Sequence, residues 1–321
     1  MSDKFYCTKI LVLGAGSWGT ALSKVLACNV KDILLYTRDI NVLEGINRYH
    51  VNAKKFSGIP LPSNIKAVNN YNDTQDVNSV VIVTPVKSLN DVFSNLEKSQ
   101  KFKNIILCSK GIDNDTLKFP SQICKRYFPN ANIAVLSGPN FAREVVLKKM
   151  TKTLIASTNR PLVKYLQKIF KTEYFYPEVS SDIAGVEICG AIKNVIAIAM
   201  GIARGLDLGD NFIASLFVNA TEEMVKIVQA LGGRKKTVYS LAGLGDLLLT
   251  SYSLASRNTS FGYNIAQEWE SKGLDQMTIE GYYTAKSIFD ITTKLGLKVP
   301  ICNYVYNTLY NKTDLHKIME L

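Results

Sequence analysis

ILVLGAGSWGTAL, at residues 10–22, is the stretch of sequence that decides the fold of the N-terminal half. The apolar residues before the first glycine predict a strand buried on both faces, and a helical pattern follows over 17–28. Between the two lie Gly14, Gly16 and Gly19, in the spacing G-x-G-x-x-G. A glycine turn that directly links a buried strand to a helix is typical of a dinucleotide-binding site, whereas a chance glycine turn, the alternative, requires no such context.

Each glycine has a separate physical role in such a turn. Gly14 permits the tight bend, Gly16 lets a pyrophosphate approach the backbone, and Gly19 allows the helix to pack closely on the strand. The N-terminus of the helix offers free N–H groups and the positive end of its dipole to the phosphates. The sequence therefore predicts that the N-terminal half binds NAD or NADP.

The end of the second expected strand, at 33–36, bears on the choice between these two cofactors. An acidic residue at this place commonly binds the ribose hydroxyls of NAD. Here the strand is followed by Thr37, Arg38 and Asp39. Arg38 can hold the 2′-phosphate of NADP, while Asp39 can bind ribose hydroxyls. We expect NADPH to be favoured, with NADH left open.

Outward from this stretch, the first half of the chain alternates strand-like and helix-like segments. The further expected strands are apolar runs at 80–83, 105–108, 133–136 and 153–156. This rhythm indicates a mostly parallel sheet covered by helices.

The second half has a different pattern. From Asp182 onward the apolar residues fall into long helical stretches, expected at 183–203, 211–231, 265–272, 282–294 and 301–309, with a polar loop at 250–262. We therefore expect two domains, 1–181 and 182–321.

The composition, with 47% hydrophobic and 20% charged residues, is that of a folded globular protein. The formal net charge is +11, but the lysines are scattered and form no tract of the roughly five to eight basic residues typical of nucleic-acid-binding segments. We expect a solvated lysine-rich surface and no nucleic-acid partner. The alternative is a bias toward anionic substrates.

Cysteine and histidine usage argues against a metal site. The six cysteines contain no C-x-x-C pair, and the two histidines, His50 and His316, lie far apart in sequence. We expect no metal, and a proton-transfer group other than histidine. The first nine residues contain Asp3 and no long apolar core, and no uncharged apolar stretch reaches about 18 residues. We therefore expect a cytoplasmic protein without membrane insertion.

Polar or special residues follow three of the expected strands, the first of them Thr84 and Pro85 after the strand at 80–83. Ligands of an open parallel sheet gather beyond the carboxyl ends of its strands. Lys110 comes just after the strand at 105–108, and Gly138 and Asn140 come after the strand at 133–136. Lys110 is suited to contact an anion or a carbonyl group. The alternative is an ordinary lysine of a surface loop.

Lys193 is the more informative lysine. In a helix its neighbours one and two turns away include Val186, Cys189, Ile196 and Met200, and this face has no partner charge. A lysine against an apolar wall has a lowered pKa, which suits acid–base catalysis near neutrality. The alternative is a lysine at a domain edge whose ammonium reaches water.

A third polar group stands later in the chain. Asp246 follows two closely spaced glycines and can orient Lys193 or a substrate hydroxyl. Arg257, flanked by Ser256 and Asn258, is suited to phosphate because a guanidinium offers several donors in a fork. The alternative is a helix cap beside a surface arginine.

These residues together resemble the bacterial-type NAD(P)-dependent glycerol-3-phosphate dehydrogenase family. The matching stretches follow the family's order across nearly the whole chain and are GAGSWGTAL at 14–22, SKG at 109–111, SGPNFAREV at 137–145, EICGAIKNVIAIAMGI at 187–202, LAGLGDLLLT at 241–250, SRNTSFG at 256–262 and IEG at 279–281. Each stretch alone is unspecific, but the set is highly specific.

The resemblance implies an α/β fold, with an N-terminal Rossmann domain on a doubly wound sheet and a C-terminal all-helical domain, assembled as a homodimer. It implies interconversion of dihydroxyacetone phosphate and sn-glycerol 3-phosphate by hydride transfer with NAD(P)H, which supplies glycerol phosphate for phospholipid synthesis. Lys193 would then be the proton donor and acceptor, with Lys110 and Asp246 beside it in the catalytic group.

The resemblance also implies two sets of ligand contacts. The cofactor contacts would be Gly14, Gly16, Ser17, Trp18, Gly19, Arg38, Lys110, Ala142, Arg257, Thr278 and Glu280. The substrate contacts would be Lys110, Gly138, Asn140, Lys193, Asp246, Ser256, Arg257 and Asn258. Asn140 departs from the pattern, since the family usually has Ser or Thr at that position.

Two other classes of function compete with this interpretation. A two-domain reductase of another small hydroxy acid would share the N-terminal half, but a substrate without phosphate does not require the Arg257 group. A sensor that binds NAD(P) without catalysis would not require Lys193 and Asp246. The preferred direction, feedback regulation, the dimer surface and the role of the excess lysines are left open by the sequence.

Overall fold

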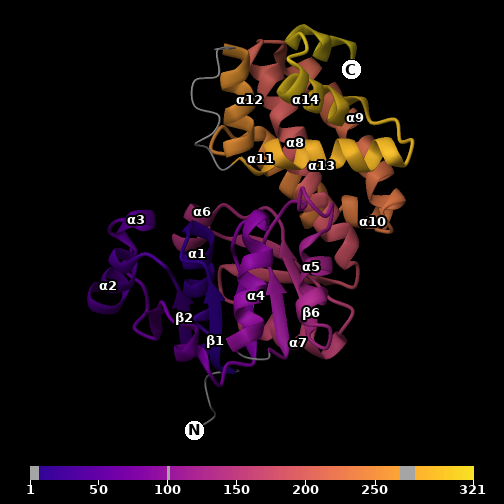
Figure 1. Cartoon of the computed structure of the whole chain (residues 1–321). Helices are drawn as coiled ribbons and strands as arrows, with labels where there is room; N and C mark the ends of the chain where they lie inside the picture. The colour runs from indigo at the N-terminus through magenta and orange to yellow at the C-terminus, as the bar shows by residue number, and fades with distance from the viewer. Residues whose placement is uncertain (1–6, 100–101, 268–278) are drawn as a thin grey trace. The chain divides into compact units, whose positions relative to one another are not determined.

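The computed structural model describes residues 7–99, 102–267 and 279–321 (Figure 1). Its contacts divide the chain into two compact units. The first, here called the sheet unit, comprises residues 1–109 and 120–183, and the second, the helical unit, comprises residues 110–119 and 184–321. The segment 110–119 groups with the helical unit because Ile112 and Phe119 are buried in its hydrophobic core.

The sheet unit is built on an eight-stranded sheet in the order β3-β2-β1-β4-β5-β6-β7-β8. The strands are β1 (Cys7–Leu13), β2 (Val30–Tyr36), β3 (Ile65–Val68), β4 (Ser79–Ile82), β5 (Asn104–Leu107), β6 (Asn132–Ser137), β7 (Thr151–Ala156) and β8 (Phe175–Ser180). Neighbours are parallel except β6 and β7, which are antiparallel. The order reverses beside β1, which lies between β2 and β4, so the carboxyl ends of these strands form the switch point at which such sheets bind ligands. The predicted α/β doubly wound class is confirmed.

The two edge strands, β3 and β8, are not predicted by the sequence pattern, and both have features that obscure them. β3 has only four residues and alternates buried and exposed positions, with Lys66 exposed. β8 contains Pro177, which cannot donate to a central ladder and is tolerated at an edge. Periodicity therefore predicts the centre of this sheet better than its margins.

Helices flank the sheet, and they are α1 (Ser17–Leu26), α2 (Ile40–Tyr49), α3 (Ala53–Phe56), α4 (Leu89–Ser99), α5 (Pro120–Tyr127), α6 (Ala142–Val146) and α7 (Arg160–Phe170). Short 3-10 turns lie at Tyr71–Thr74 and Val86–Ser88. The consecutive residues Ile10, Leu11 and Val12 of β1 are all fully buried, as expected for a strand covered on both faces. Leu22 and Val25 of α1 belong to the same core.

The helical unit is arranged around α8 and contains α8 (Ile183–Gly205), α9 (Gly209–Ala230), α10 (Lys235–Val238), α11 (Asp246–Tyr252), α12 (Arg257–Gln267), α13 (Glu280–Lys294) and α14 (Pro300–Asn311), with a π-helical turn at Leu241–Gly245 and a 3-10 helix at Leu315–Glu320. In the described part of the chain, α8 is the one helix long and apolar enough to cross a membrane by composition. However, 89% of its apolar window is buried inside the protein, as in the core helix of a globular unit.

The expected polar loop at 250–262 is wrong. Thr250 lies within α11, and α12 begins at Arg257. The sequence Arg257–Gln267 has few apolar residues, but packing on α8 makes it helical. A Cβ on Gly262 would lie 2.1 Å from the carbonyl oxygen of Ile198, so the two helices cross in backbone contact. Of the helix expected at 265–272, residues 268–272 lie outside the described part of the chain.

Candidate active site

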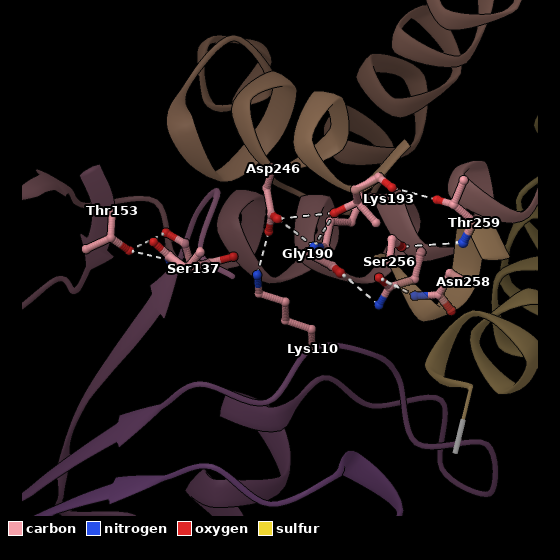
Figure 2. A network of polar contacts seen from close by, with 12 residues as sticks. Lys110, Ser137, Thr153, Gly190, Lys193, Asp246, Ser256, Asn258 and Thr259 are labelled. Carbon is pink, nitrogen blue, oxygen red and sulfur yellow. Dashed lines mark hydrogen bonds and ion pairs between the residues drawn. The ribbon is translucent and has the colours of Figure 1, made fainter. Parts of the chain in front are cut away.

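Two ammonium groups of the helical unit meet around one carboxylate (Figure 2). Lys193 Nζ, from the middle of α8, lies 2.5 Å from Asp246 Oδ1, and Lys110 Nζ lies 2.5 Å from Asp246 Oδ2. The Lys193 and Asp246 side chains are 8% and 2% exposed, whereas the Lys110 side chain is 23% exposed. The carboxylate is therefore shared between one buried and one partly accessible ammonium group.

The backbone before α11 fixes the position of Asp246. Asp246 is the first residue of α11 and follows the π-helical turn Leu241–Gly245. Within this turn, a Cβ on Gly243 would lie 2.0 Å from the carbonyl oxygen of Val238, so no larger residue fits without movement. π-Helical turns frequently occur at functional sites, where they redirect the following side chains.

Two threonines complete the surroundings of Lys193. Its Nζ donates to Thr250 Oγ1 at 2.8 Å, one turn of α11 beyond Asp246. Thr259 Oγ1 of α12 donates to the backbone carbonyl of Thr250 at 2.5 Å. Because an ammonium has three hydrogens, the bonds to Asp246 and Thr250 account for two and leave one for a ligand.

Burial is the main influence on the two innermost charges. It lowers the pKa of Lys193 to about 8, while the Asp246 carboxylate acts to raise that pKa and the Lys110 ammonium acts to lower it. For Asp246, burial acts to raise the pKa, but the charges of Lys110 and Lys193 outweigh it and hold the pKa below its ordinary value. Asp246 is thus ionised at neutral pH, and Lys193 titrates in the range suited to a general acid–base group.

A chain of amides lies next to Lys193 on α8. Asn258 Nδ2 donates to Asn194 Oδ1 at 3.0 Å, and Asn258 Oδ1 accepts from Gly281 N at 2.9 Å. These bonds tie the first turn of α12 to α8 and to the start of α13, where Glu280 is the first helical residue. The result is a fixed, buried polar network made of residues far apart in sequence.

The start of α12 holds the group predicted to bind phosphate. Arg257 is the first residue of the helix and is exposed. Ser256 is buried, and its Oγ accepts from Thr259 N at 3.4 Å. This geometry fits both interpretations of the sequence, a helix cap beside an exposed arginine and a phosphate site, because helix N-termini also bind anions.

In the sheet unit, the glycine turn fits a dinucleotide. A Cβ on Gly19 would lie 1.8 Å from the carbonyl oxygen of Gly14, so α1 contacts the turn too closely for any side chain. A Cβ on Gly16 would meet nothing within 4 Å, which leaves the backbone open to an approaching pyrophosphate. Ser17 and Trp18 begin α1, whose first turn has no acidic residue.

After β2, the carboxylate of Asp39 is engaged with its own surroundings. Oδ1 accepts from the backbone N–H groups of Asn41 and Val42 at 3.0 and 3.3 Å and caps α2. Oδ2 lies 2.6 Å from Lys54 Nζ. The hydrogen bond from Lys54 is the main reason that the pKa of Asp39 is lowered. Arg38 beside it is exposed.

After β6, the predicted contact residues lie on a bent segment. Gly138 has φ +152°, a conformation that favours glycine. Asn140 Nδ2 donates to Thr153 Oγ1 at 2.9 Å, and that hydroxyl donates to the carbonyl of Ser137 (Figure 2). Asn140 Oδ1 is buried and has no partner in the described part of the chain. A buried acceptor of this kind is suited to a ligand donor.

Comparison with known proteins decides the family. Residues 9–163 match the family model described as NAD-dependent glycerol-3-phosphate dehydrogenase N-terminus, and residues 182–320 match the model of its C-terminus. The chain belongs to the NAD-dependent glycerol-3-phosphate dehydrogenase family. The resemblance predicted from the sequence is confirmed.

Similar proteins of the glycerol-3-phosphate dehydrogenase family cover nearly the whole chain. The glycerol-3-phosphate dehydrogenase (NAD(P)+) of Erythrobacter litoralis is 37% identical over 92% of this chain and 90% of its own length. That of Clostridium botulinum is 36% identical over 96% of this chain and 94% of its own length. The crystal structure of the Coxiella burnetii glycerol-3-phosphate dehydrogenase superposes with a TM-score of 0.90 at 29% identity, with 98% of each chain covered.

A more distant likeness concerns the fold alone. The crystal structure of a Bacillus subtilis protein described as a probable 2-dehydropantoate 2-reductase has a TM-score of 0.59 at 13% identity, with 95% of this chain and 100% of that chain covered. Reductases of other small acids thus share the architecture, and the glycerol-3-phosphate dehydrogenase family shares the sequence as well.

Within this glycerol-3-phosphate dehydrogenase family member, the structure brings some predicted residues together and leaves others apart. Lys110, Lys193 and Asp246 form one cluster. Ser256, Arg257 and Asn258 share the start of α12. The remaining predicted contacts of the sheet unit lie on separate elements of that unit; Ala142, for example, is the first residue of α6. Thr278 lies outside the described residues.

The sequence analysis misses Thr250 and Thr259. An available signal is the spacing of four residues between Asp246 and Thr250, which places both side chains on one face of a helix.

Proposed function

We propose that the chain catalyses the reversible reaction in which dihydroxyacetone phosphate, NAD(P)H and a proton give sn-glycerol 3-phosphate and NAD(P)+. The observation that carries this proposal is the contact of buried Lys193 and partly exposed Lys110 with the buried Asp246 carboxylate in a member of the glycerol-3-phosphate dehydrogenase family. The curated relatives are named glycerol-3-phosphate dehydrogenase (NAD(P)+).

The glycine turn and the first turn of α1 would hold the cofactor pyrophosphate, with Gly16 giving the open approach and Gly19 the close packing. The bound cofactor would supply or accept the hydride at C2 of the substrate. We assign the remaining cofactor contacts to Ser17, Trp18, Arg38, Lys110, Ala142, Arg257, Thr278 and Glu280.

Lys193 would carry the proton. During reduction its ammonium donates a proton to the oxygen at C2, and during oxidation its neutral amine accepts the proton back. The lowered pKa of about 8 makes both forms accessible near neutrality. Asp246 would hold Lys193 in place, while the partly exposed Lys110 would stabilise negative charge on the same oxygen.

The substrate phosphate would bind at the start of α12. Arg257 supplies a fork of donors, and Ser256 and Asn258 lie in the same turn. A hydroxy acid without phosphate would not need this group of donors. The group therefore favours a phosphorylated substrate over the substrate of the alternative function, a reductase of another small hydroxy acid. Gly138 and Asn140 complete the proposed contacts, with the buried Asn140 Oδ1 as an acceptor for a substrate hydroxyl.

NADPH would be the preferred cofactor. The carboxylate of Asp39, which could otherwise bind the ribose hydroxyls of NADH, already caps α2 and pairs with Lys54. Arg38 is exposed at the same strand end and can meet a 2′-phosphate.

The proposal includes a cytoplasmic homodimer that supplies glycerol phosphate for phospholipid synthesis. It also includes a cofactor domain at 1–181 and a substrate domain at 182–321, with the qualification that 110–119 groups with the helical unit.

The direct experiment measures cofactor oxidation by the purified protein after addition of dihydroxyacetone phosphate, with NADPH and NADH in parallel. Rapid oxidation that requires this substrate is the expected result, and the ratio of the two rates tests Arg38. Absence of oxidation by folded protein that binds NADPH would refute the substrate assignment and favour a sensor that binds the cofactor without catalysis.

A further inference from the structure

Three lysines of the sheet unit line one cleft away from the glycine turn. A cleft of about 800 Å³ opens where Lys9 of β1, Lys31 of β2 and Lys103 before β5 lie, at the amino ends of these strands. The glycine turn follows the carboxyl end of β1, so the cleft and the turn are at opposite ends of the same strand. Its volume is in the range of about 300–1,000 Å³ that is usual for small-molecule sites.

A ladder of amide side chains lines the cleft across successive strands. Asn104 Nδ2 donates to Ser79 Oγ at 3.1 Å, Asn132 Nδ2 donates to Asn104 Oδ1 at 3.1 Å, and Asn159 Nδ2 donates to Asn132 Oδ1 at 2.6 Å. Each amide nitrogen has a second hydrogen, and each amide oxygen has a second lone pair. The ladder therefore holds its members in fixed orientations that can bind a polar ligand.

The ladder ends at a helix N-terminus. Asn159 Oδ1 accepts from Leu162 N at 2.9 Å and so caps the eleven-residue helix α7. The positive end of the helix dipole thus lies beside the amides and the lysines, and it adds to the attraction for an anion.

The charge around the cleft is strongly one-sided. Lys31 and Lys103 are exposed, and in the described part of the chain neither is among the lysines paired with a carboxylate. Asp76 is the one carboxylate among the described residues that line the cleft. Like charges gathered in a hollow focus the electric field there and raise the local concentration of anions.

The positive potential continues along α7. Lys164 and Lys168 line a second hollow, which shares Pro161 and Tyr165 with the cleft. With Asp76 counted, the three lysines leave a net charge of about +2 in the cleft, which attracts a compact ligand with two or three phosphate groups, and the amides suit its remaining oxygens and hydroxyls.

We propose that this cleft binds a small soluble anion with clustered phosphates, of the size of a nucleoside di- or triphosphate, at a site separate from the dinucleotide turn. The lysines neutralise the phosphates, and the Asn104–Asn132–Asn159 ladder fixes the orientation of the ligand. Such a second site gives the protein a way to sense a phosphorylated metabolite without competition at the active site.

The test is calorimetric titration of the NADPH-saturated protein with inorganic tripolyphosphate and, separately, with ATP. Saturation with NADPH keeps both probes from the glycine turn, and an excess of sn-glycerol 3-phosphate, which NADPH cannot reduce, keeps them from the phosphate site proposed at the start of α12. We expect one site per chain, and a dissociation constant raised about tenfold or more in the double variant Lys31→Gln/Lys103→Gln, because each loses a charge-assisted hydrogen bond. The matched control is Lys66→Gln/Lys125→Gln, which removes the same charge from exposed positions outside the cleft and is expected to bind as the unaltered protein does.

A second variant distinguishes a loss of binding from a loss of folding. Asn78 lines the cleft and is exposed, and Asn78→Asp keeps its shape while adding a negative charge. It is expected to weaken binding without altering the thermal unfolding midpoint. The proposal is overturned if the unaltered protein binds neither probe at millimolar concentration, or if the cleft and control variants weaken binding equally, which would indicate diffuse surface charge.

Discussion

Lys193 Nζ and Asp246 Oδ1 lie 2.5 Å apart, and both residues are less than one tenth exposed. In an isolated buried ion pair the carboxylate would keep the lysine charged far above neutral pH. Here Asp246 is also bonded to Lys110, and burial lowers the pKa of Lys193 to about 8 despite the carboxylate. A pKa of about 8 fits the role proposed for Lys193 as the proton donor, and the first predictions test that role.

Replacement of Lys193 by alanine should remove catalysis while leaving the cofactor bound. The glycine turn belongs to the sheet unit, so NADPH affinity, measured by fluorescence titration, should change little. The turnover number with dihydroxyacetone phosphate should fall by about 10²–10⁴-fold, the usual contribution of a general acid. A Lys193→Ala protein with near-normal turnover would show that the proton comes from another group.

The pH dependence should have opposite signs in the two directions. Reduction requires protonated Lys193, so kcat/KM for dihydroxyacetone phosphate should fall as pH rises through about 8. Oxidation of glycerol 3-phosphate requires the neutral amine, so its kcat/KM should rise through the same pH. Measuring kcat/KM for reduction and for oxidation from about pH 6 to about pH 10 tests both trends.

Asp246→Asn should move this inflexion to lower pH. The Asp246 charge raises the pKa of Lys193, and its removal should lower that pKa by about one unit or more. Thr250→Val removes the hydroxyl that accepts from Lys193 and donates to Asp246 but leaves both charges in place, so it is the matched control and should move the inflexion less. An unchanged profile in Asp246→Asn would mean that a different group is titrated.

The sequence predicts this site in part, and the reason is local. Lys193 is recognisable because the helical period places apolar residues around it. The fingerprint at Gly14, Gly16 and Gly19 is recognisable because its function lies in consecutive backbone geometry. Both signals are contained within a few turns of one element, and they require no knowledge of tertiary contacts.

The contacts that complete the site depend on tertiary packing. Asn258 meets Asn194 because α12 crosses α8 at Gly262, and this crossing also makes a helix of a stretch with few apolar residues. The segment 110–119 follows a strand of the sheet unit, and its grouping with the helical unit depends on where Ile112 and Phe119 become buried. Periodicity contains no information about such partners.

Arg38 should determine the preference for NADPH. Arg38→Ala should raise the KM for NADPH about tenfold, the effect of one lost charge-assisted contact to a 2′-phosphate, and should leave the KM for NADH nearly unchanged. Lys54→Gln is an informative companion, because it removes the ion pair of Asp39 and leaves Oδ2 available to ribose hydroxyls while Oδ1 still caps α2. It should improve NADH use. Equal effects of Arg38→Ala on both cofactors would contradict the assignment.

Alanine substitutions at Gly16 and Gly19 should differ in their effects on cofactor binding and on stability. Gly16→Ala places a methyl group in open space, so the protein should stay folded while NADPH binding weakens at least tenfold. Gly19→Ala places a methyl group 1.8 Å from the Gly14 carbonyl oxygen, so it should lower the thermal unfolding midpoint as well. Differential scanning calorimetry beside NADPH titration distinguishes the two. Normal NADPH affinity in folded Gly16→Ala would exclude the turn as the pyrophosphate site.

Glu223 should be a stability residue without a catalytic role. Its Oε1 accepts from Ile301 N at 2.6 Å and its Oε2 from Cys302 N at 3.1 Å, so a side chain of α9 caps α14, which itself begins with Pro300. Ile301 and Cys302 are buried, and Glu223→Ala should therefore cost about 2–5 kcal/mol in free energy of unfolding, because two N–H groups lose their acceptor.

Glu223→Gln retains the size of the side chain but offers one acceptor and a competing donor, so its cost should be smaller, about 1–2 kcal/mol. The neighbouring Glu222 is exposed, and Glu222→Gln should change stability by no more than about 0.5 kcal/mol. Urea unfolding followed by circular dichroism measures all three. If Glu223→Ala were as stable as Glu222→Gln, water or another group would have to satisfy the start of α14.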